Sequence, residues 1–354
     1  MASPKKFAAG FAGGLLLILA AFGAAFQLQL GVPTQSSEWC WQLNTRKQQL
    51  AEAAGTPKLL LVGGSSTLFG LKARDIQART QIPAVNLGTH AALGADYILH
   101  LARKCTRPGD TVLLCLEYEL YSDSSVDELF LDYLLSRDPG YFHSLPFSEQ
   151  IQMGMAIPWK RLKQGLRSRG KVVRAEYRYP YDIACINESG DQIGATIERR
   201  PPGKPYLARL SECLVAGAPS DSRGLRAVAS FVSWAKSHQV RVLATFPAIC
   251  PRREYESAPA QQTLRAVESF YASLGVPLLG DAQEAMLDPE LFFDTLYHLT
   301  EEGARERTRR LLIHLTPLLP TTSRHQGASG PTASAVKGRN TSGCLLSSSA
   351  PMSS

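Results

Sequence analysis

Two short polar clusters in this sequence carry side chains that together could do nucleophilic chemistry. Ser65 lies in the cluster GGSST, directly after the apolar run KLLLV, and Asp294 and His298 lie in the cluster DTLYHLT. A serine hydroxyl becomes a nucleophile when an imidazole takes its proton and a carboxylate orients that imidazole. We therefore predict Ser65 as the nucleophile, His298 as its proton acceptor and Asp294 as the group that fixes the His298 tautomer.

A third cluster, NLGTH, supplies candidate donors for a negative charge that develops on a substrate. The backbone N–H of Gly88 and the side-chain amide of Asn86 could form an oxyanion hole. An ordinary turn between a strand and a helix explains the same residues equally well. His90 is a candidate substrate contact, and its alternative role is to begin the following helix.

Charged side chains near two other apolar runs are secondary candidates. Glu117 and Glu119 in LEYEL could act as acid or base, but we expect both to face solvent or to pair with basic residues. Arg252 and Arg253 in PAICPRR could contact an anionic substrate at the rim of a pocket.

Five short apolar runs alternate with helical patterns, which is typical of a parallel sheet with helices on both faces. Catalytic groups of such a sheet collect at the carboxyl ends of its strands, where the three clusters lie. The predicted strands are 58–64, 83–88, 109–120, 241–246 and 276–280. The predicted helices around them are 41–54, 71–80, 91–104, 225–237, 261–274 and 300–315.

The pattern becomes irregular between 121 and 224, which we interpret as an insertion after the third strand that forms a lid or a partner surface. It contains helical patches at 126–135 and 147–166 and a predicted hairpin at 181–197. The hairpin turn, NESGD, has residues suited to positive φ. The main domain is therefore predicted as 56–320, and the Ser/Thr/Gly/Pro-rich segment 321–354 as a disordered tail.

The N-terminal segment 1–30 predicts a membrane anchor or a signal sequence. Lys5 and Lys6 precede twenty uncharged residues, 7–26, and no charged residue follows until Glu38. Twenty apolar residues span a bilayer core of about 30 Å at about 1.5 Å per residue. The flanking lysines place the N-terminus in the cytoplasm and the remainder outside it, as a single-pass periplasmic protein; a cleaved signal peptide would make it secreted. Residues 31–55 are predicted as a connector.

Composition limits the remaining classes of function. The chain has 354 residues, of which 44% are hydrophobic and 19% charged, as in globular proteins. The net charge of +7 is concentrated only in 160–174, where we favour a solvated helix face over a nucleic-acid or polyanion site; an anionic polysaccharide or a phospholipid surface would suit this patch equally well. We expect no nucleic-acid partner. Seven scattered cysteines, without metal-ligand spacing, predict core residues with one or two disulfides at most. We expect no metal and no cofactor.

These motifs resemble those of the SGNH/GDSL hydrolase superfamily over about 59–315. GGSSTLFG resembles its first block, with Gly64 in place of the usual Asp; NLG resembles the second block and DTLYHLT the last. The resemblance implies a three-layer α/β/α sandwich with a five-stranded parallel sheet, a Ser-His-Asp triad, and an oxyanion hole that includes Gly88. The third-block Asn of the family is missing here, and Asn86 or Tyr118 is the candidate replacement, Tyr118 also as a substrate contact.

The resemblance and the N-terminal segment together imply an envelope protein similar to those of polysaccharide O-acetylation. The leading hypothesis is a serine esterase or O-acyltransferase acting on an acylated carbohydrate or glycopolymer, alongside a membrane-bound acyltransferase partner. The alternative is a non-catalytic envelope module that binds glycan or that acyltransferase. A phosphate or flavin site at the GGSST turn is a third interpretation, but it leaves Asp294 and His298 without a role.

Overall fold

The computed structural model describes residues 4–122, 127–174, 179–202 and 221–319. Its centre is a five-stranded sheet in the order β2-β1-β3-β4-β5, in which every pair is parallel. The strands are β1 (Leu59–Val62), β2 (Ala84–Asn86), β3 (Thr111–Leu114), β4 (Arg241–Thr245) and β5 (Leu278–Leu279). Each observed strand lies within a run predicted as a strand, which confirms the predicted sheet.

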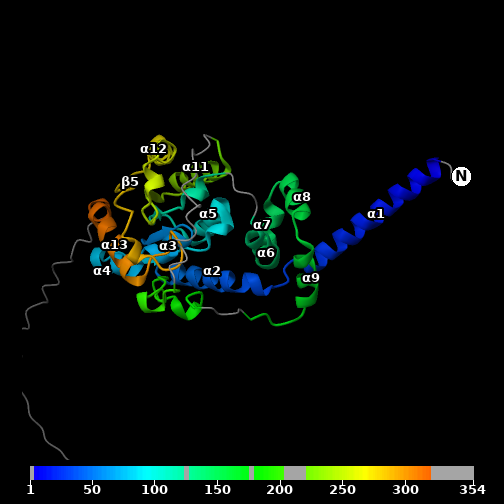
Figure 1. Cartoon of the computed structure of the whole chain (residues 1–354), viewed down its shortest axis with the longest axis horizontal. Helices are drawn as coiled ribbons and strands as arrows, with labels where there is room; N and C mark the ends of the chain where they lie inside the picture. Colours follow the sequence, from blue (N-terminus) through cyan, green and yellow to red (C-terminus); the bar gives the residue numbers. More distant parts are fainter. Residues whose placement is uncertain (1–3, 123–126, 175–178, 203–220, 320–354) are drawn as a thin grey trace, which may run out of the picture. The chain divides into compact units, whose positions relative to one another are not determined.

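Helices cover both faces of the sheet, because side chains of both faces are apolar (Figure 1). Leu60, Val62 and Val112 point into a core shared with helices α5 and α11, and Leu59 and Leu61 point into a second core shared with α4 and α13. This alternation buries the strands on both sides. A further helix, α12, lies beside β5. The helices are α4 (Ala73–Thr80), α5 (Gly94–Cys105), α11 (Arg223–Ser237), α12 (Ala258–Ser273) and α13 (Glu301–Leu315). The predicted three-layer α/β/α sandwich is confirmed.

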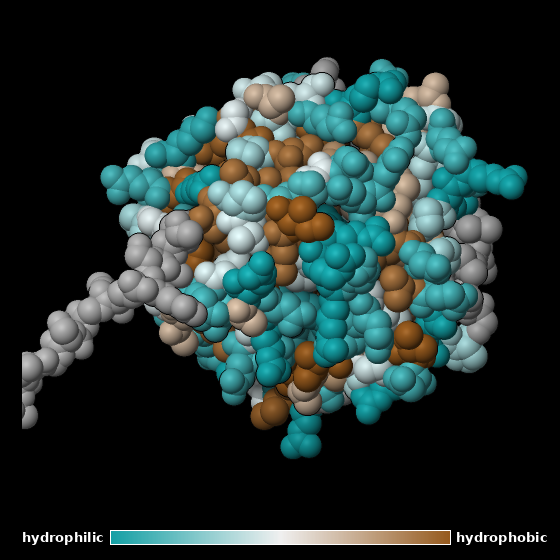
Figure 2. All heavy atoms as spheres, turned by 90° about the vertical axis from the view of Figure 1, so that its left-hand side faces the viewer, coloured by the Kyte–Doolittle hydropathy of each residue, from teal (hydrophilic) through white to brown (hydrophobic). Residues whose placement is uncertain are grey.

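The face on the side of α4 and α13 is predominantly hydrophilic on its outside. Figure 2 shows this face, where hydrophilic side chains cover most of the surface and hydrophobic ones are interspersed among them. Helix α13 shows why, since its buried positions alternate with charged exposed ones. Most apolar residues of these helices are therefore used inside the sandwich, and Ile313 of α13 is an exposed exception.

The described part of the insertion is mainly helical. It contains α6 (Glu128–Arg137), α7 (Pro139–Ser144), α8 (Phe147–Met155) and α9 (Trp159–Ser168), and short 3₁₀ turns at 183–185 and 197–199. The single helical patch predicted at 147–166 is two helices, because Pro158 lacks the N–H that would continue α8. The predicted hairpin at 181–197 is reduced to one antiparallel bridge, Ile186 with Gln192, around the expected turn.

Two N-terminal helices precede the sheet. Helix α1 (Pro4–Gln29) is long and apolar enough to cross a membrane, and the rest of the chain buries none of its most apolar window. Helix α2 (Gln35–Ala53), in the segment predicted as a connector, packs against α6 and buries Cys40 and Leu43. The disordered tail predicted at 321–354 lies outside the described residues.

The cysteines of the described residues behave as core side chains. Cys40, Cys105, Cys115, Cys185 and Cys250 are buried and have free thiols. Cys213 and Cys344 lie outside the described residues. Burial raises the pKa of Cys105 and Cys115 to about 11, so their thiols stay protonated at neutral pH.

Candidate active site

A cavity of about 540 Å³ lies at the carboxyl edge of the sheet and collects side chains from distant parts of the chain. Ser65, His90 and His298 all line it, so the structure brings three of the sequence-predicted residues to one place. The other lining residues come from α2, from the short helix that Ser65 begins, from the segments after β2 and β3, from the insertion and from the loop before α13. They are Ser36, Trp39, Cys40, Leu68, Phe69, Thr89, Glu119, Leu129, Tyr181, Thr295, Leu296 and Tyr297.

Ser65 is the first residue of α3 (Ser65–Gly70), which follows β1 after two glycines. The chain turns so tightly here that a Cβ on Gly63 would lie 2.1 Å from the Cys115 backbone oxygen and 2.1 Å from Thr67 Oγ1. The Thr67 hydroxyl in turn donates to the Cys115 oxygen at 2.6 Å. The glycine is therefore required by close approach to the neighbouring β3 segment, and this turn fixes Ser65 at the sheet edge.

Asp294 and His298 form a hydrogen-bonded pair in the loop before α13. His298 Nδ1 lies 2.7 Å from Asp294 Oδ1, and the Tyr181 hydroxyl donates to Asp294 Oδ2 at 2.9 Å. Burial alone would raise the Asp294 pKa, but the hydrogen bond and charge of His298, with the Tyr181 donor, outweigh it and lower that pKa. Asp294 is therefore ionised and can hold Nδ1 protonated, which leaves Nε2 as the nitrogen able to take a proton.

The imidazole of His298 is also held by packing. Its ring stacks on Phe69 of α3 with centroids 4.2 Å apart and planes 11° apart. Phe69 is four residues beyond Ser65, so one short helix carries both the candidate nucleophile and the ring that supports its candidate base. The His298 backbone is fixed as well, because its N–H donates to Thr295 Oγ1 and its carbonyl accepts from Phe293 N–H at 2.7 Å.

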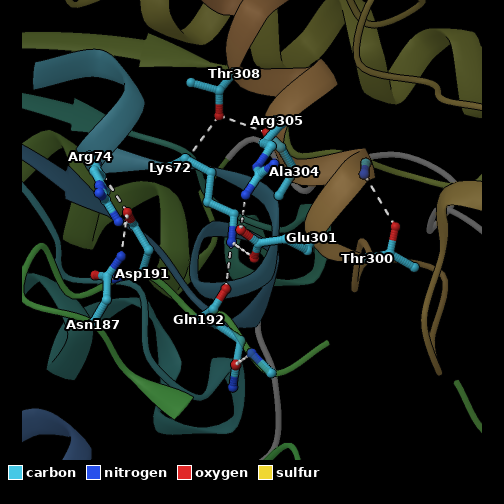
Figure 3. A network of polar contacts seen from close by, with 12 residues as sticks. Lys72, Arg74, Asn187, Asp191, Gln192, Thr300, Glu301, Ala304, Arg305 and Thr308 are labelled. Atoms are coloured by element: carbon cyan, nitrogen blue, oxygen red, sulfur yellow. Dashed lines mark hydrogen bonds and ion pairs between the residues drawn. The ribbon is translucent and has the colours of Figure 1, made fainter. Parts of the chain in front are cut away.

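A buried polar network ties the insertion to the helix that follows this loop (Figure 3). Lys72 Nζ donates to the Gln192 backbone oxygen and forms an ion pair with Glu301 in the first turn of α13. Asp191 accepts from the backbone N–H groups of Ala73 and Arg74 at 2.7 and 3.0 Å, at the start of α4. The network fixes the insertion against α4 and α13, and this insertion brings Tyr181 to the site.

Glu117 is buried behind Ser65, which corrects the expectation that it faces solvent or pairs with a basic residue. Its carboxylate accepts from Ser66 N–H at 2.6 Å, from Gly64 N–H at 3.1 Å and from Ser65 Oγ at 3.3 Å. Burial raises its pKa to about 7, while the Ser66 and Gly64 donors counteract that rise. Ser65 thus has Glu117, not His298, as its hydrogen-bond partner. Glu119 lines the cavity and accepts from the Tyr297 hydroxyl at 2.8 Å.

The two predicted oxyanion donors are occupied by contacts within the protein. Gly88 N–H donates to Asn86 Oδ1 at 2.8 Å, and Asn86 Nδ2 donates to the backbone oxygens of Thr67 and Leu71. Asn86 is fully buried, and neither residue lines the cavity. In this structure Asn86 joins β2 to the ends of α3, so its amide is not aimed at a substrate.

The three predicted substrate contacts separate in the structure. His90 lines the cavity, and its Nδ1 accepts from Ala92 N–H at 3.1 Å at the start of a 3₁₀ turn, which is the alternative role predicted for it; its role as a substrate contact stays a prediction. Burial and then the nearby charge of His298 lower the His90 pKa, which keeps its ring neutral. Tyr118 packs in the main core, and Arg252 lines a different cavity, of about 680 Å³, beside Glu254. The structure does not bring either to Ser65.

Sequence reasoning missed Tyr181 and Phe69 and misjudged Glu117. A signal existed for Phe69, because position i+4 from a residue on a helix shares its face. Glu117 lies near the carboxyl end of the predicted strand 109–120, and that position could have placed it at the same edge of the sheet as Ser65. Tyr181 had no local signal, since it reaches Asp294 from 113 residues away.

Comparisons with known proteins add little to this geometry. No protein-family model and no curated protein matches the chain. Among solved structures, it is similar to one from Streptococcus pneumonia described as a "putative platelet activating factor", with 13% identity and a TM-score of 0.37, over 77% of this chain and 91% of that one.

Proposed function

We propose that this protein is a serine-dependent ester hydrolase or O-acyltransferase of SGNH type, with Ser65, His298 and Asp294 as its triad. One observation carries the proposal: His298, which pairs with the half-buried Asp294, and a serine at a glycine-rich strand-to-helix turn line one cavity at the carboxyl edge of a parallel sheet. These are the residue types and roles that activated serine chemistry needs, whatever their order in the chain.

In the proposed reaction, Ser65 Oγ attacks the carbonyl carbon of an acyl ester as His298 Nε2 takes its proton. The ionised Asp294 stabilises the imidazolium that forms, and the leaving alcohol then takes that proton. Water or an acceptor hydroxyl releases the acyl group from Ser65 and restores the serine. Before the attack, the Ser65 hydroxyl must give up its bond with Glu117 and donate to His298 instead.

The proposed substrate is an acylated carbohydrate or envelope glycopolymer, reached from outside the cytoplasm. The cavity supports a ligand of that kind because aromatic faces and polar tips line it together, among them Trp39, Tyr181 and Tyr297. Helix α1 would anchor the protein in the cell membrane, with the sheet domain in the periplasm and a membrane-bound acyltransferase as its partner.

The decisive experiment compares purified wild type with Ser65→Ala on an activated acetyl ester. Ser66→Ala is the matched control, because it removes the neighbouring buried hydroxyl and leaves that of Ser65. We expect Ser65→Ala to lose at least 10³-fold in kcat/KM and Ser66→Ala to lose much less. Mass spectrometry should detect acylated Ser65 in the wild type. Equal rates in wild type and Ser65→Ala would refute the nucleophile.

A second candidate function is a non-catalytic envelope module that binds glycan or a membrane acyltransferase. The observation that favours it is that Glu117 occupies the Gly64 and Ser66 amides and the Ser65 hydroxyl, which leaves fewer donors for an oxyanion. This candidate predicts no ester turnover by wild type, together with capture of a membrane partner that survives Ser65→Ala.

A further inference from the structure

We propose that α8 and α9 form a membrane-contacting surface that binds anionic phospholipid beside α1. The inference rests on the anchoring role proposed for α1 and adds a second, interfacial contact with the same bilayer. Three independent observations support it: the position of α9 against α1, the exposed apolar side chains of the two helices, and the charge of α9.

Helix α9 packs against the C-terminal end of α1 (Figure 1). The Trp159 ring contacts the Phe22 ring edge-on at 6.5 Å, and the Arg161 guanidinium donates to Gln29 Oε1. The apolar run of α1 ends at Phe26, four residues beyond Phe22, so Trp159 lies about one helical turn inside that end. This is the depth at which tryptophan is enriched in membrane proteins, where the hydrocarbon core meets the headgroups.

Several large apolar side chains of α8 and α9 face away from the protein, although Met153 and Leu162 are buried. Phe147, Ile151 and Met155 are spaced four residues apart, which places them on one face of α8, and they are 75%, 44% and 75% exposed. Trp159 is 72% exposed despite its contact with Phe22. Large apolar side chains grouped in this way indicate a surface that something else covers. Because α1 provides the bilayer next to them, we infer that the bilayer covers them.

The polar face of α9 has the charge that an anionic bilayer attracts. Residues 159–174 contain seven basic and no acidic residues. Lys160, Lys163 and Arg167 recur at helical spacing, and none of them forms an ion pair within the described residues. Lysine and arginine stems can lie along apolar surface while their charged ends reach headgroup phosphates. Apolar anchors next to unpaired cations distinguish a bilayer from a soluble anionic glycan, which would need only the cations.

The same cations line a groove that continues toward the candidate active site. The groove has a volume of about 870 Å³ and lies between α2, α6 and α9. It shares Ser36, Trp39 and Leu129 with the cavity of Ser65. A membrane contact through α9 would therefore turn the entrance of that cavity toward the lipid surface, where a membrane-bound donor or partner is found.

The experiment uses the full chain reconstituted in vesicles that contain phosphatidylglycerol, with brominated acyl chains as the quencher of tryptophan fluorescence. We expect quenching in the wild type, loss of most of it in Trp159→Phe, and no such loss in Trp234→Phe, the matched control in α11. The triple variant carries Lys160→Gln, Lys163→Gln and Arg167→Gln. Its loss of Trp159 quenching should be at least tenfold smaller in neutral vesicles than in phosphatidylglycerol vesicles, because only the anionic lipid attracts those cations.

Alkaline carbonate extraction of the same vesicles tests α1 separately. If the protein is extracted, the proposed anchoring fails; if it stays inserted while Trp159 shows no quenching, the inference about α8 and α9 alone is overturned. The inference would also be overturned if the protein bound a soluble polyanionic glycan, lost that binding in the triple variant and showed no Trp159 quenching. That result would favour a glycan site.

Discussion

Replacing Glu117 with Gln should remove a pH dependence of stability that the buried carboxyl imposes on the protein. Burial raises the Glu117 pKa from 4.5 to about 7 in the folded state. The folded state therefore binds the Glu117 proton more tightly than the unfolded chain does. This contribution to stability is fully present below pH 4.5 and is lost as the pH rises through 7.

The size of the effect follows from the two pKa values. A shift from 4.5 to about 7 corresponds to roughly 3 kcal/mol of unfolding free energy, and roughly 2 to 3 kcal/mol of it lies between pH 5 and 8. Gln resembles the protonated carboxyl in size and stays neutral, so the stability of the variant should change little between pH 5 and 8, apart from a constant loss because its Nε2 cannot accept one of the two backbone N–H groups. Relative to wild type, the variant should therefore gain roughly 2 to 3 kcal/mol between pH 5 and 8.

Urea unfolding of both proteins in detergent micelles, at intervals from pH 5 to 8, measures this difference. Other groups also titrate in the window, among them Lys47, whose burial lowers its pKa to about 7. They are common to both proteins, so the difference between the two curves isolates Glu117. If the free energy of unfolding changes with pH in parallel for wild type and Glu117→Gln, the buried Glu117 carboxyl does not ionise between pH 5 and 8 and the reasoning is refuted.

Three further predictions concern the residues that position the site. Tyr181→Phe should lower kcat on the acetyl ester about tenfold and move the acidic limb of the pH profile of kcat to higher pH, because the charged form of Asp294 loses a hydrogen-bond donor. An unchanged profile would contradict this. Lys72→Met should cost about 2 kcal/mol in urea unfolding, since it removes the buried partner of the Glu301 carboxylate and leaves only the exposed Arg305 paired with it, and a loss under about 1 kcal/mol would argue against the network. Gly63→Ala should lower the thermal midpoint by more than 10 °C, because its Cβ has no room, and a normal midpoint would show that the turn can relax.

The sequence predicted the sheet and, through local patterns, where the residues of the proposed triad lie. Short apolar runs alternating with helices predict parallel strands, and the residues that follow such strands must meet at one edge. That rule placed Ser65 and the Asp294–His298 loop at the same edge, and the structure places Ser65 and His298 in one cavity there. The Asp294–His298 pair is four residues apart, so a single loop could form it without help from the remainder of the chain.

Only the tertiary structure decided which donors and acceptors are already taken. Asn86 and Gly88 had the right chemistry for an oxyanion hole, but the packing of α3 against β2 gives their hydrogen bonds to the protein itself. Glu117 and Tyr181 reach the site across 52 and 113 residues of sequence. Each polar group has few bonds to give, and which neighbour receives them depends on distances that a sequence pattern does not contain. Position along a strand is therefore a local property, whereas the availability of a hydrogen bond is a property of the whole fold.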